Sequence, residues 1–256
     1  MIPSWPSLIA APTVIGALAG VTAYGAVHPR SHLFGPCISA TDGARKLALT
    51  FDDGPNPAIT PKLLDLLGRY NAKATFFVIG KFVRECPALA KEIHSHGHVL
   101  GNHTNTHPNL FFCGPAETRI ELQRCSEAIV HATWEAPRWF RPPYGYRSPW
   151  LGEIVHQQNM RTVMWSLLPG DWRPKTLEWL AQRMQPIATN VQQAKEKGTT
   201  PATHDNGDIL CLHDGDARHL NGNRANTLAA LQYWLPRWRD LGLEFVTMAQ
   251  AAGGSA

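Results

Sequence analysis

The sequence has few charged residues and no long run of basic ones. Only 17% of its 256 residues are charged, and 24 Lys and Arg against 20 Asp and Glu give a formal net charge of +4. This charge argues against nucleic acid as the dedicated partner, although anionic cell-wall polymers still attract a weakly basic surface. The sequence also lacks internal repeats and low-complexity tracts. With 44% hydrophobic residues, its length fits one domain with a sizeable core.

Cysteine is scarce and is not arranged as a metal or redox motif. No two cysteines form a CxxC pair, so we expect no metal ligation by thiolates. Their odd number leaves at least one free thiol, and their spacing requires no disulfide. The cysteines are Cys37, Cys86, Cys113, Cys125 and Cys211.

Charge is absent from residues 7–27, which are weakly apolar and rich in Ala and Gly. A helix of about 20 apolar residues spans a membrane, so this stretch is long enough. No Lys or Arg precedes it, so the basic start of a secretory signal is missing. Three interpretations stay open: an uncleaved membrane anchor, a signal peptide cleaved near Ala23-Tyr24-Gly25, or a helix packed on the domain. Residues 28–44 then form a polar connector, which divides the chain into residues 1–43 and 44–256.

Short apolar runs alternate with amphipathic stretches, which predicts an α/β fold with a parallel sheet of about seven strands. We expect strands at Leu47–Phe51, Thr75–Ile79, His98–Asn102, Trp139–Arg141, Thr162–Trp165, Ile209–Leu212 and Phe245–Thr247. We expect helices at Pro61–Tyr70, Val83–His94, Ala116–Thr133, Trp150–Gln157, Leu177–Ile187 and Ala225–Leu241. Polar motifs follow the strands, at the carboxyl rim where barrel enzymes assemble their sites. The polar stretch 188–208 is interpreted as a mobile loop that borders a substrate groove.

Two adjacent acids, Asp52 and Asp53, end the apolar run Leu47–Phe51 and precede Gly54-Pro55. Carboxylates at the end of a buried strand are costly to desolvate unless a cation or a catalytic task compensates them. Successive side chains leave a strand in opposite directions, so one acid can hold a metal while the other takes a proton from water. For these residues alone, an acidic pair in a solvated turn is the alternative.

His103 and His107 supply the missing ligands. They lie four residues apart, so on one helical turn they share a face and can bind the same ion. Neutral imidazole suits zinc, and two histidines with one carboxylate leave an open position for water, as a catalytic site requires. His94, His96 and His98 flank a glycine in a loop, and we interpret them as non-catalytic.

Five motifs together carry a resemblance to a known family. In chain order, they are Thr50–Pro55, His103–His107, Arg141–Tyr144, Asp171-Trp172 and Leu212–Asp214. From about residue 44 to residue 250, the sequence resembles the polysaccharide deacetylase family, also called the NodB homology domain or carbohydrate esterase family 4. The resemblance implies a distorted (β/α) barrel and metal-dependent removal of N-acetyl, occasionally O-acetyl, groups from sugars.

The resemblance also implies a role for each matching residue near the metal. Asp53, His103 and His107 would bind one divalent ion, usually zinc, with cobalt or nickel as substitutes. Asp52 would be the general base that deprotonates the metal-activated water. The backbone N–H of Tyr144 would stabilise the oxyanion together with the metal.

The remaining motif residues would provide the general acid, orient the acid and the base, and line the substrate pocket. His213 would be the general acid that protonates the departing amine, and Asp171 would orient His213 and favour its protonated form. Arg141 would orient the base, since its planar fork suits a carboxylate. The substrate pocket would be lined by Trp172, Cys211, Leu212 and Pro143.

Without the other motifs, several of these residues have ordinary structural alternatives. Arg141 would be a surface residue in a rigid loop, Asp171 a helix N-cap, and His213 a hydrogen-bonded core residue. Asp214 and Asp216 are interpreted as loop acids rather than ligands.

Two positions depart from the family pattern. Leu168 stands where the family often has a further acid, and Cys211 replaces a leucine that lines the acetyl pocket. A buried cysteine behaves as a small hydrophobe, so we expect a wider pocket. Both changes leave the metal and acid–base residues intact and bear on acetyl selectivity.

The sequence therefore predicts a metal-dependent hydrolase that removes N-acetyl groups from N-acetylglucosamine-containing poly- or oligosaccharides of the chitin or peptidoglycan type. Acetylxylan-type O-deacetylation and deformylation of a lipid-linked sugar are alternatives on the same site. A carbohydrate-binding protein without turnover is a further alternative, but binding alone needs neither the acid nor the base. We expect a protein of the cell envelope, either anchored through residues 7–27 or secreted, and the sequence predicts no oligomeric state.

Overall fold

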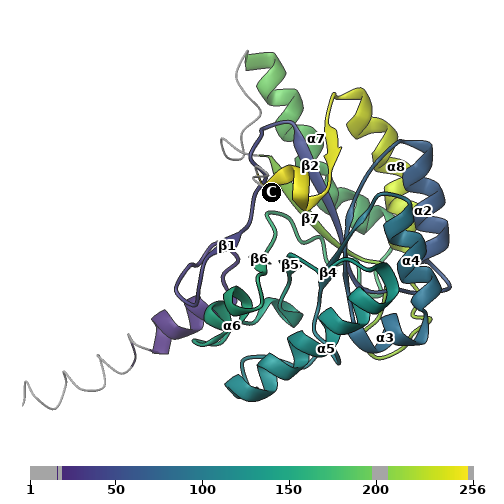
Figure 1. The fold of residues 1–256 in the computed structure, drawn as a ribbon. Helices are drawn as coiled ribbons and strands as arrows, with labels where there is room; N and C mark the ends of the chain where they lie inside the picture. Colours follow the sequence, from purple (N-terminus) through teal and green to yellow (C-terminus); the bar gives the residue numbers. More distant parts are fainter. Residues whose placement is uncertain (1–15, 17–18, 198–206, 253–256) are drawn as a thin grey trace, which may run out of the picture.

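The computed structural model describes residues 16, 19–197 and 207–252. Its centre is one sheet in the order β1-β6-β5-β4-β3-β2-β7, with β8 paired to β2 (Figure 1). The strand pairings are parallel throughout this sheet. The α/β fold with a parallel sheet, predicted from the alternation of strands and helices, is confirmed.

The strands lie close to their predicted positions. They are β1 (Cys37–Ile38), β2 (Lys46–Gly54), β3 (Thr75–Val78), β4 (Val99–Asn102), β5 (Trp139–Phe140), β6 (Arg161–Val163), β7 (Asp208–His213) and β8 (Glu244–Val246). The predicted strands correspond to β2 through β8. The additional strand β1 lies in the predicted connector and is too short to show a periodic pattern. Pairing with β6 defines it, while the division of the chain at residue 44 stays a prediction.

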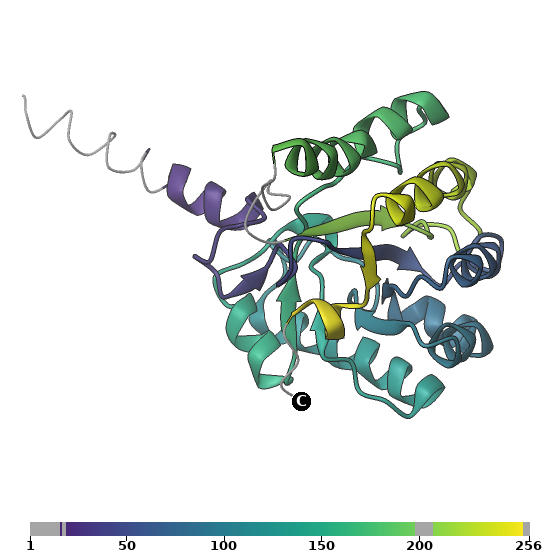
Figure 2. The same cartoon turned by 90° about the horizontal axis from the view of Figure 1, so that it is seen from above.

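The helices fill the connections between strands. They are α2 (Thr60–Arg69), α3 (Gly80–Glu85), α4 (Pro87–Ser95), α5 (Pro115–Thr133), α6 (Leu151–Gln157), α7 (Leu177–Lys197), α8 (Ala225–Asp240) and α9 (Met248–Ala251), with a 3₁₀ turn η1 (Pro143–Gly145). Seen from above, the helices lie outside the strands (Figure 2).

The sheet curls into a barrel with an irregular seam. An isolated parallel bridge joins Leu167, which follows β6, to Leu210 in β7. The N–H of Cys211 donates to the carbonyl oxygen of Leu167 at 3.0 Å across the same seam. The bridge brings the chain after β6 back to β7, so the carboxyl ends of the strands surround one rim.

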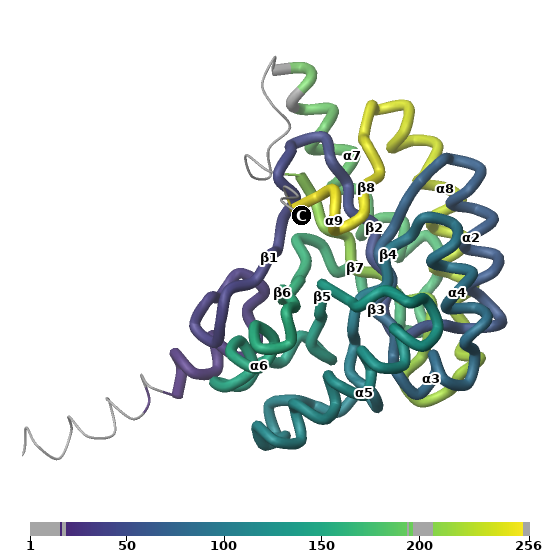
Figure 3. The backbone as a smooth tube through the Cα atoms, viewed as in Figure 1, coloured from purple at the N-terminus to yellow at the C-terminus, as the bar shows by residue number. Residues whose placement is uncertain are grey.

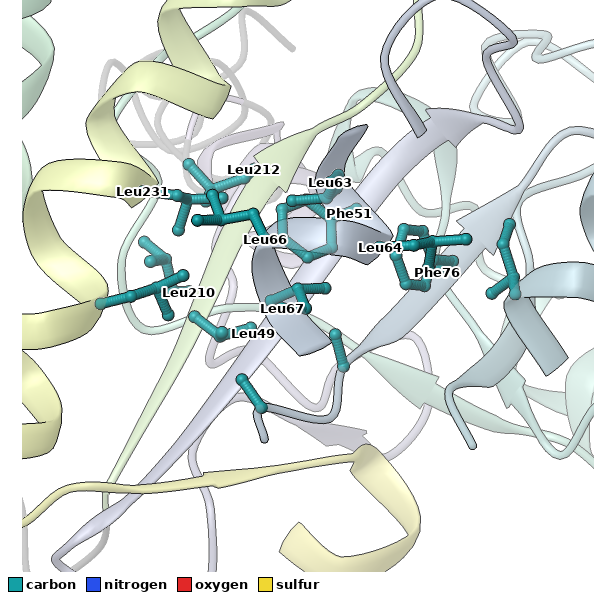
Figure 4. Close-up of a cluster of buried hydrophobic side chains, with 14 of the residues drawn as sticks. Leu49, Phe51, Leu63, Leu64, Leu66, Leu67, Phe76, Leu210, Leu212 and Leu231 are labelled. Atoms are coloured by element: carbon teal, nitrogen blue, oxygen red, sulfur yellow. The ribbon is translucent and has the colours of Figure 1, made fainter. Parts of the chain in front are cut away.

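Side chains along β2 alternate between two apolar clusters. Leu49 and Phe51 face α2 and α8 in the larger cluster (Figure 4). Ala48 lies on the other face, in a smaller cluster inside the barrel. Because side chains repeat every second residue along a strand, Thr50 and Asp52 share the inner face with Ala48. The strand thus carries Asp52 to the inner side of the rim.

The C-terminal elements lie at the opposite end of β2. Strand β8 pairs with Lys46, Leu47 and Ala48 at the start of β2, and Figure 3 shows β8 and α9 beside it. The N–H of Met248 donates to the hydroxyl of Thr75 at 2.9 Å. Both elements therefore cover the amino end of the barrel.

Two helix predictions differ from the structure. The helix predicted over Val83–His94 is two helices, because Pro87 lacks an N–H to continue α3 and instead begins α4. The mobile loop predicted from residue 188 is wrong for residues 188–197, which continue α7 to Lys197. Ile187 and Val191 are buried in the larger cluster, so packing extends this helix beyond the point where its composition turns polar. Residues 198–206 of the predicted loop lie outside the described residues.

The described part of the N-terminal segment is tied to the barrel. Residues 19–27 are helical. The buried guanidinium of Arg147, which follows η1, donates to the carbonyl oxygen of Ser31 at 2.5 Å and to that of His28. Across the described ranges, no helix is long and apolar enough to cross a membrane. Because residues 7–15 and 17–18 lie outside those ranges, the interpretations of the N-terminal segment stay predictions.

Candidate active site

Asp52 and Asp53 line the same cavity at the rim. Asp52 continues the inner face of β2 and is buried. Asp53 has a left-handed backbone with φ of 70°, and the pairing with β3 shifts register between Asp52 and Gly54. This kink interrupts the strand alternation, so the second carboxylate turns toward the cavity instead of away from it. Aspartate is one of the few residues that tolerate this conformation.

Asp53, His103 and His107 form a compact group whose ligand atoms all lie within 4.8 Å of one another. The Oδ1 atom of Asp53 lies 3.2 Å from Nε2 of His107 and 3.5 Å from Nε2 of His103. This oxygen is buried and accepts no hydrogen bond from the residues that the structure describes. A buried, unpartnered carboxylate oxygen facing two imidazole nitrogens fits a shared cation, and one oxygen with two nitrogens fits zinc and similar ions.

The hydrogen bond of His103 and the burial of His107 both suit metal ligation by a ring nitrogen. Nδ1 of His103 donates a hydrogen bond to the carbonyl oxygen of Arg141 at 2.7 Å, which leaves Nε2 as the ligand atom. Burial, followed by repulsion from His103, lowers the pKa of His107 to about 4, so this ring is neutral near pH 7.

A loop, rather than the predicted helical turn, brings the two histidines together. The ring centroids of His103 and His107 are 4.9 Å apart. Thr104 and His107 have left-handed backbones, with φ of 66° and 63°. The residues after β4 therefore coil tightly at the rim, and the predicted proximity arises from different local geometry.

Arg141 is fully buried and is fixed by several partners. Its Nη1 donates to Oδ1 of Asp52 at 2.8 Å and to the hydroxyl of Thr50 at 2.7 Å. Its Nη2 donates to the carbonyl oxygen of Met164 at 2.9 Å, and the guanidinium lies 4.2 Å from the ring centroid of Phe77. The surface-loop alternative is wrong for this arginine, which instead orients Asp52 and balances its charge.

Cys211 contacts Asp52 directly. Its Sγ lies 3.4 Å from Oδ2 of Asp52 and 3.4 Å from Nη1 of Arg141. Burial, followed by the negative charge of Asp52, raises the pKa of the Cys211 thiol well above its usual value. The thiol therefore stays protonated and donates to the carboxylate, a role that its interpretation as a small hydrophobe did not include.

His213 forms a charged pair with Asp171. Nδ1 of His213 lies 2.8 Å from Oδ1 of Asp171, and the backbone N–H of His213 donates to Oδ2 at 2.8 Å. The hydroxyl of Thr227 in α8 also donates to Oδ2 of Asp171 at 2.8 Å. Burial disfavours the charged imidazole, but the Asp171 carboxylate, together with the charges of Asp53 and Asp52, outweighs this effect and raises the pKa of His213 to about 9. His213 therefore carries a proton at neutral pH.

The cavity at the rim has a volume of about 440 Å³ and aromatic walls. The ring of Tyr144 packs edge-on to His107 at 4.7 Å, and Trp172 packs edge-on to His213 at 5.0 Å. These aromatic side chains are 58% and 40% exposed, so their faces are available to a sugar ring. A larger cavity of about 640 Å³ lies at the amino ends of β4, β5 and β6 and holds none of the motif residues.

Two of the predicted pocket residues lie elsewhere. Leu212 is buried in the larger cluster on the helix side of β7, because it points opposite to Cys211. Pro143 is buried in η1, and its neighbour Pro142 lines the cavity instead. The predictions of Leu212 and Pro143 as pocket residues are wrong, whereas Trp172 and Cys211 do line it.

Sequence reasoning missed several residues of the site. Trp165, Arg218 and Arg224 line the cavity. Trp165 had a signal, because it is the last residue of the predicted strand Thr162–Trp165, where rim residues are expected. Thr227 and Arg224 had none, since both flank the start of an ordinary surface helix.

Asp214 lies in the bend after β7 and outside the metal group, as predicted, but it is fully buried. The hydroxyl of Thr60 donates to its Oδ2, and Asn56 Nδ2 donates to its backbone carbonyl oxygen at 2.8 Å. Burial raises the pKa of Asp214 from 3.8 to about 7. The folded protein therefore holds this proton more tightly than the unfolded chain, and its contribution to stability is lost as the pH rises from about 4 through about 7.

The variant Asp214→Asn is expected to become more stable relative to the wild type as the pH rises from about 4.5 to about 8. Asparagine keeps an acceptor for Thr60 and removes the titration, which costs at most about 1.4 kcal/mol per pH unit. Thermal unfolding at both pH values measures the difference in Tm between the two proteins. A difference that does not grow with pH would show that Asp214 is not protonated in the folded state.

Most of the chain is similar in sequence to known proteins. A sequence model of the polysaccharide deacetylase family matches residues 39–163. A chitooligosaccharide deacetylase of Azorhizobium caulinodans is 33% identical over 217 residues, which cover 82% of this chain and 96% of that protein. The chain belongs to the polysaccharide deacetylase family. As a member of carbohydrate esterase family 4, it is a hydrolase.

This polysaccharide deacetylase is also similar to proteins that act on peptidoglycan, in sequence and in structure. A peptidoglycan-N-acetylglucosamine deacetylase of Bacillus cereus is 34% identical over 205 residues, covering 80% of this chain and 86% of that protein. The crystal structure of the Bc1960 peptidoglycan N-acetylglucosamine deacetylase is similar with a TM-score of 0.72 at 30% identity, over 86% of this chain and 93% of that one. The fold and family implied by the five motifs are confirmed.

Proposed function

We propose that this deacetylase removes the acetyl group from N-acetylglucosamine in a polysaccharide or oligosaccharide of the chitin or peptidoglycan type. One observation carries the proposal: a carboxylate held by arginine and a protonated histidine line the same cavity as a three-residue metal group. The names of the relatives, which include chitooligosaccharide and peptidoglycan deacetylases, support this substrate class.

Asp53, His103 and His107 would hold one divalent ion, which we propose is Zn²⁺. The donor set fits, and the unpartnered Oδ1 of Asp53 lies between the two imidazoles. A divalent ion bound there polarises the acetamide carbonyl and makes water more acidic. Co²⁺ and Ni²⁺ accept the same ligands and would substitute.

Asp52 would take the proton of the attacking water. Its Oδ1 accepts from Arg141, and its Oδ2 accepts from the Cys211 thiol, so the carboxylate is fixed in one orientation. Oδ2 lies 3.9 Å from Nε2 of His103, on the side of the metal group. A base that is pre-oriented in this way loses little freedom on the way to the transition state.

His213 would give its proton to the departing amine. Asp171 binds Nδ1 of His213, so Nε2 is the atom that would donate. The backbone N–H of Tyr144 would donate to the oxyanion, and Trp172 would cover the acetyl group beside His213. Asp52 and His213 thus divide the two proton transfers of amide hydrolysis between them.

Acetate release tests the function across three substrates: chitooligosaccharides, peptidoglycan glycan strands and acetylxylan. We expect release from the first two, loss of activity after dialysis against a chelator, and recovery when Zn²⁺ is added back. Metal analysis is expected to find about one divalent ion per chain. Chelator-resistant activity with no bound metal would remove the metal from the mechanism.

The alternatives on this site give different outcomes in the same assay. Acetate from acetylxylan alone would assign O-deacetylation, and formate from a lipid-linked formamido sugar would assign deformylation. Saccharide binding without release of either acid would assign a binding protein.

We also propose that the enzyme works in the cell envelope, where chitin-type and peptidoglycan-type polymers lie, either anchored through residues 7–27 or secreted. Fractionation of cells that express the full chain tests this, and recovery in the cytosol would contradict it.

A further inference from the structure

The cavity at the amino end of the barrel holds none of the residues that the proposed function uses. Its volume of about 640 Å³ is within the range of small-molecule sites. Its walls come from the starts of β4, β5 and β6, from the ends of α4 and α5, and from α9. Because these strands run from this cavity to the catalytic rim, the two cavities lie at opposite ends of the barrel.

His98, which precedes β4, lines this cavity although the residue is only 4% exposed. Its Nδ1 accepts a hydrogen bond from the backbone N–H of Ala74 at 3.1 Å. Burial, followed by repulsion from Lys73 and His96, lowers the pKa of His98 to about 4, so the ring is neutral near pH 7. A neutral imidazole that accepts at Nδ1 carries its proton on Nε2.

The Nε2–H group of His98 has no acceptor among residues 16, 19–197 and 207–252. The ring is also fixed edge-on against Phe76, with the ring centroids 5.4 Å apart. A buried donor without an acceptor is unfavourable, so this group favours a ligand atom or a water molecule in the cavity that accepts its hydrogen bond.

Two neighbouring arginines line the exposed side of the cavity. Arg138 precedes β5 and Arg161 begins β6, and the N–H of Arg161 donates to the carbonyl oxygen of Arg138 at 2.9 Å. Both residues are exposed, and neither guanidinium has a hydrogen bond or an ion pair with a residue that the structure describes. The guanidinium of Arg161 lies 5.4 Å from the ring centroid of Trp139.

The lining of the cavity carries a net positive charge. Among the described residues that line it, Glu135 is the one acid, and its Oε2 lies 3.7 Å from Nδ1 of His94. Arg138 and Arg161 therefore outweigh Glu135 by one charge. A single net charge matches a carboxylate better than a phosphate monoester, which carries nearly two negative charges at pH 7.

The inner wall of the cavity is apolar. Leu100, Ile129 and Trp139 line it and are buried. Since the arginines are exposed and these residues are buried, the cavity is charged at its opening and apolar further in. An apolar group that covers the inner wall gains free energy by leaving water.

We propose that this cavity binds an aromatic carboxylate, separately from the sugar substrate. The carboxylate pairs with Arg138 and Arg161, since the planar guanidinium donates two parallel hydrogen bonds to such a group. The aromatic body covers Leu100 and Ile129, and an acceptor at its far end takes the hydrogen bond of His98 Nε2. The site therefore recognises charge, apolar surface and one polar atom together.

Isothermal titration of the full chain with 6-hydroxy-2-naphthoate tests the site. We expect about one molecule to bind per chain with a Kd of about 0.1 mM. The alcohol with a hydroxymethyl group in place of the carboxylate is expected to bind about tenfold more weakly. The acid without the hydroxyl, 2-naphthoate, is expected to bind about fivefold more weakly.

Two variants assign the binding to this cavity. Arg138→Gln/Arg161→Gln is expected to lower the affinity for the hydroxy acid about tenfold and to leave that for the alcohol unchanged. His98→Asn keeps an acceptor for the N–H of Ala74 but removes the Nε2–H donor, so it is expected to bind both acids equally.

The control variant Arg237→Gln/Arg239→Gln removes the same charge from exposed positions on α8, outside the cavity, and is expected to bind as the wild type does. Tm measurements verify that each variant folds.

Four results would overturn the proposal. These are no saturable binding, equal affinity for the acid and the alcohol, or full affinity in Arg138→Gln/Arg161→Gln. The fourth is a loss of affinity in Trp172→Ala, which would place the probe in the catalytic cavity instead. Acetate release is not measured here, so a failure of this site is distinct from a failure of the proposed function.

Discussion

Replacing Asp52 by asparagine is expected to lower kcat by about a hundredfold or more, which is the usual loss when a positioned base is removed. Asparagine keeps an oxygen for Arg141 to bind, but it cannot take a proton from water. The metal group does not include Asp52, so the variant is expected to bind one divalent ion as the wild type does. Steady-state acetate release and metal titration measure the two properties separately.

The matched control is Asp53→Asn, one residue further along the chain. Asparagine tolerates the left-handed backbone of position 53, so the kink that places the side chain is kept. Losing the charged ligand is expected to weaken metal binding and turnover together. Because breaking the buried pair of Asp52 with Arg141 is destabilising, the Tm of both variants is measured first. Unchanged turnover in Asp52→Asn would assign the base to another group.

Most of the strands and helices could be predicted from the sequence, because the patterns that mark them lie within short stretches of the chain. The run Leu47–Phe51 is apolar, short and ended by Gly54-Pro55, and it forms most of β2, which pairs with β3, β7 and β8. Strand β1 has two residues and no pattern, so only its partner β6 defines it. Helix α7 continues into polar sequence because tertiary packing of Val191, rather than local composition, stabilises its last turns.

The site residues could be predicted where a motif both follows a strand and contains side chains suited to catalysis or metal binding. Asp53, His103 and His107 follow strands, and the common rim of parallel strands brings them together. Leu212 was misplaced although the alternation of β7 was available: Cys211 faces the cavity, so its neighbour faces the helices. Thr227 comes from a helix far along the chain and makes its contact only after folding, so no local pattern marks it.

Replacing Asp171 by asparagine is expected to lower kcat by about a hundredfold at pH 8 and to move the alkaline limb of the pH profile. A general acid must be protonated to act, so wild-type activity is expected to fall as the pH rises through about 9, the pKa of His213. Without the Asp171 carboxylate, only the weaker effects of Asp53 and Asp52 oppose the burial of His213, so its pKa falls. The alkaline limb is then expected at lower pH, in the profile of kcat from about pH 5 to 10.

The variant Thr227→Val separates the charge of Asp171 from its orientation. It removes the hydroxyl that donates to Oδ2 of Asp171 but leaves the carboxylate charge 2.8 Å from His213. Its activity is expected to fall only modestly, with the alkaline limb still near pH 9, because the charge sets the pKa of His213. If both variants moved the alkaline limb equally, the orientation of Asp171 by Thr227, and not its charge alone, would determine the pKa of His213. An Asp171→Asn profile that matched the wild type would mean that another group protonates the amine.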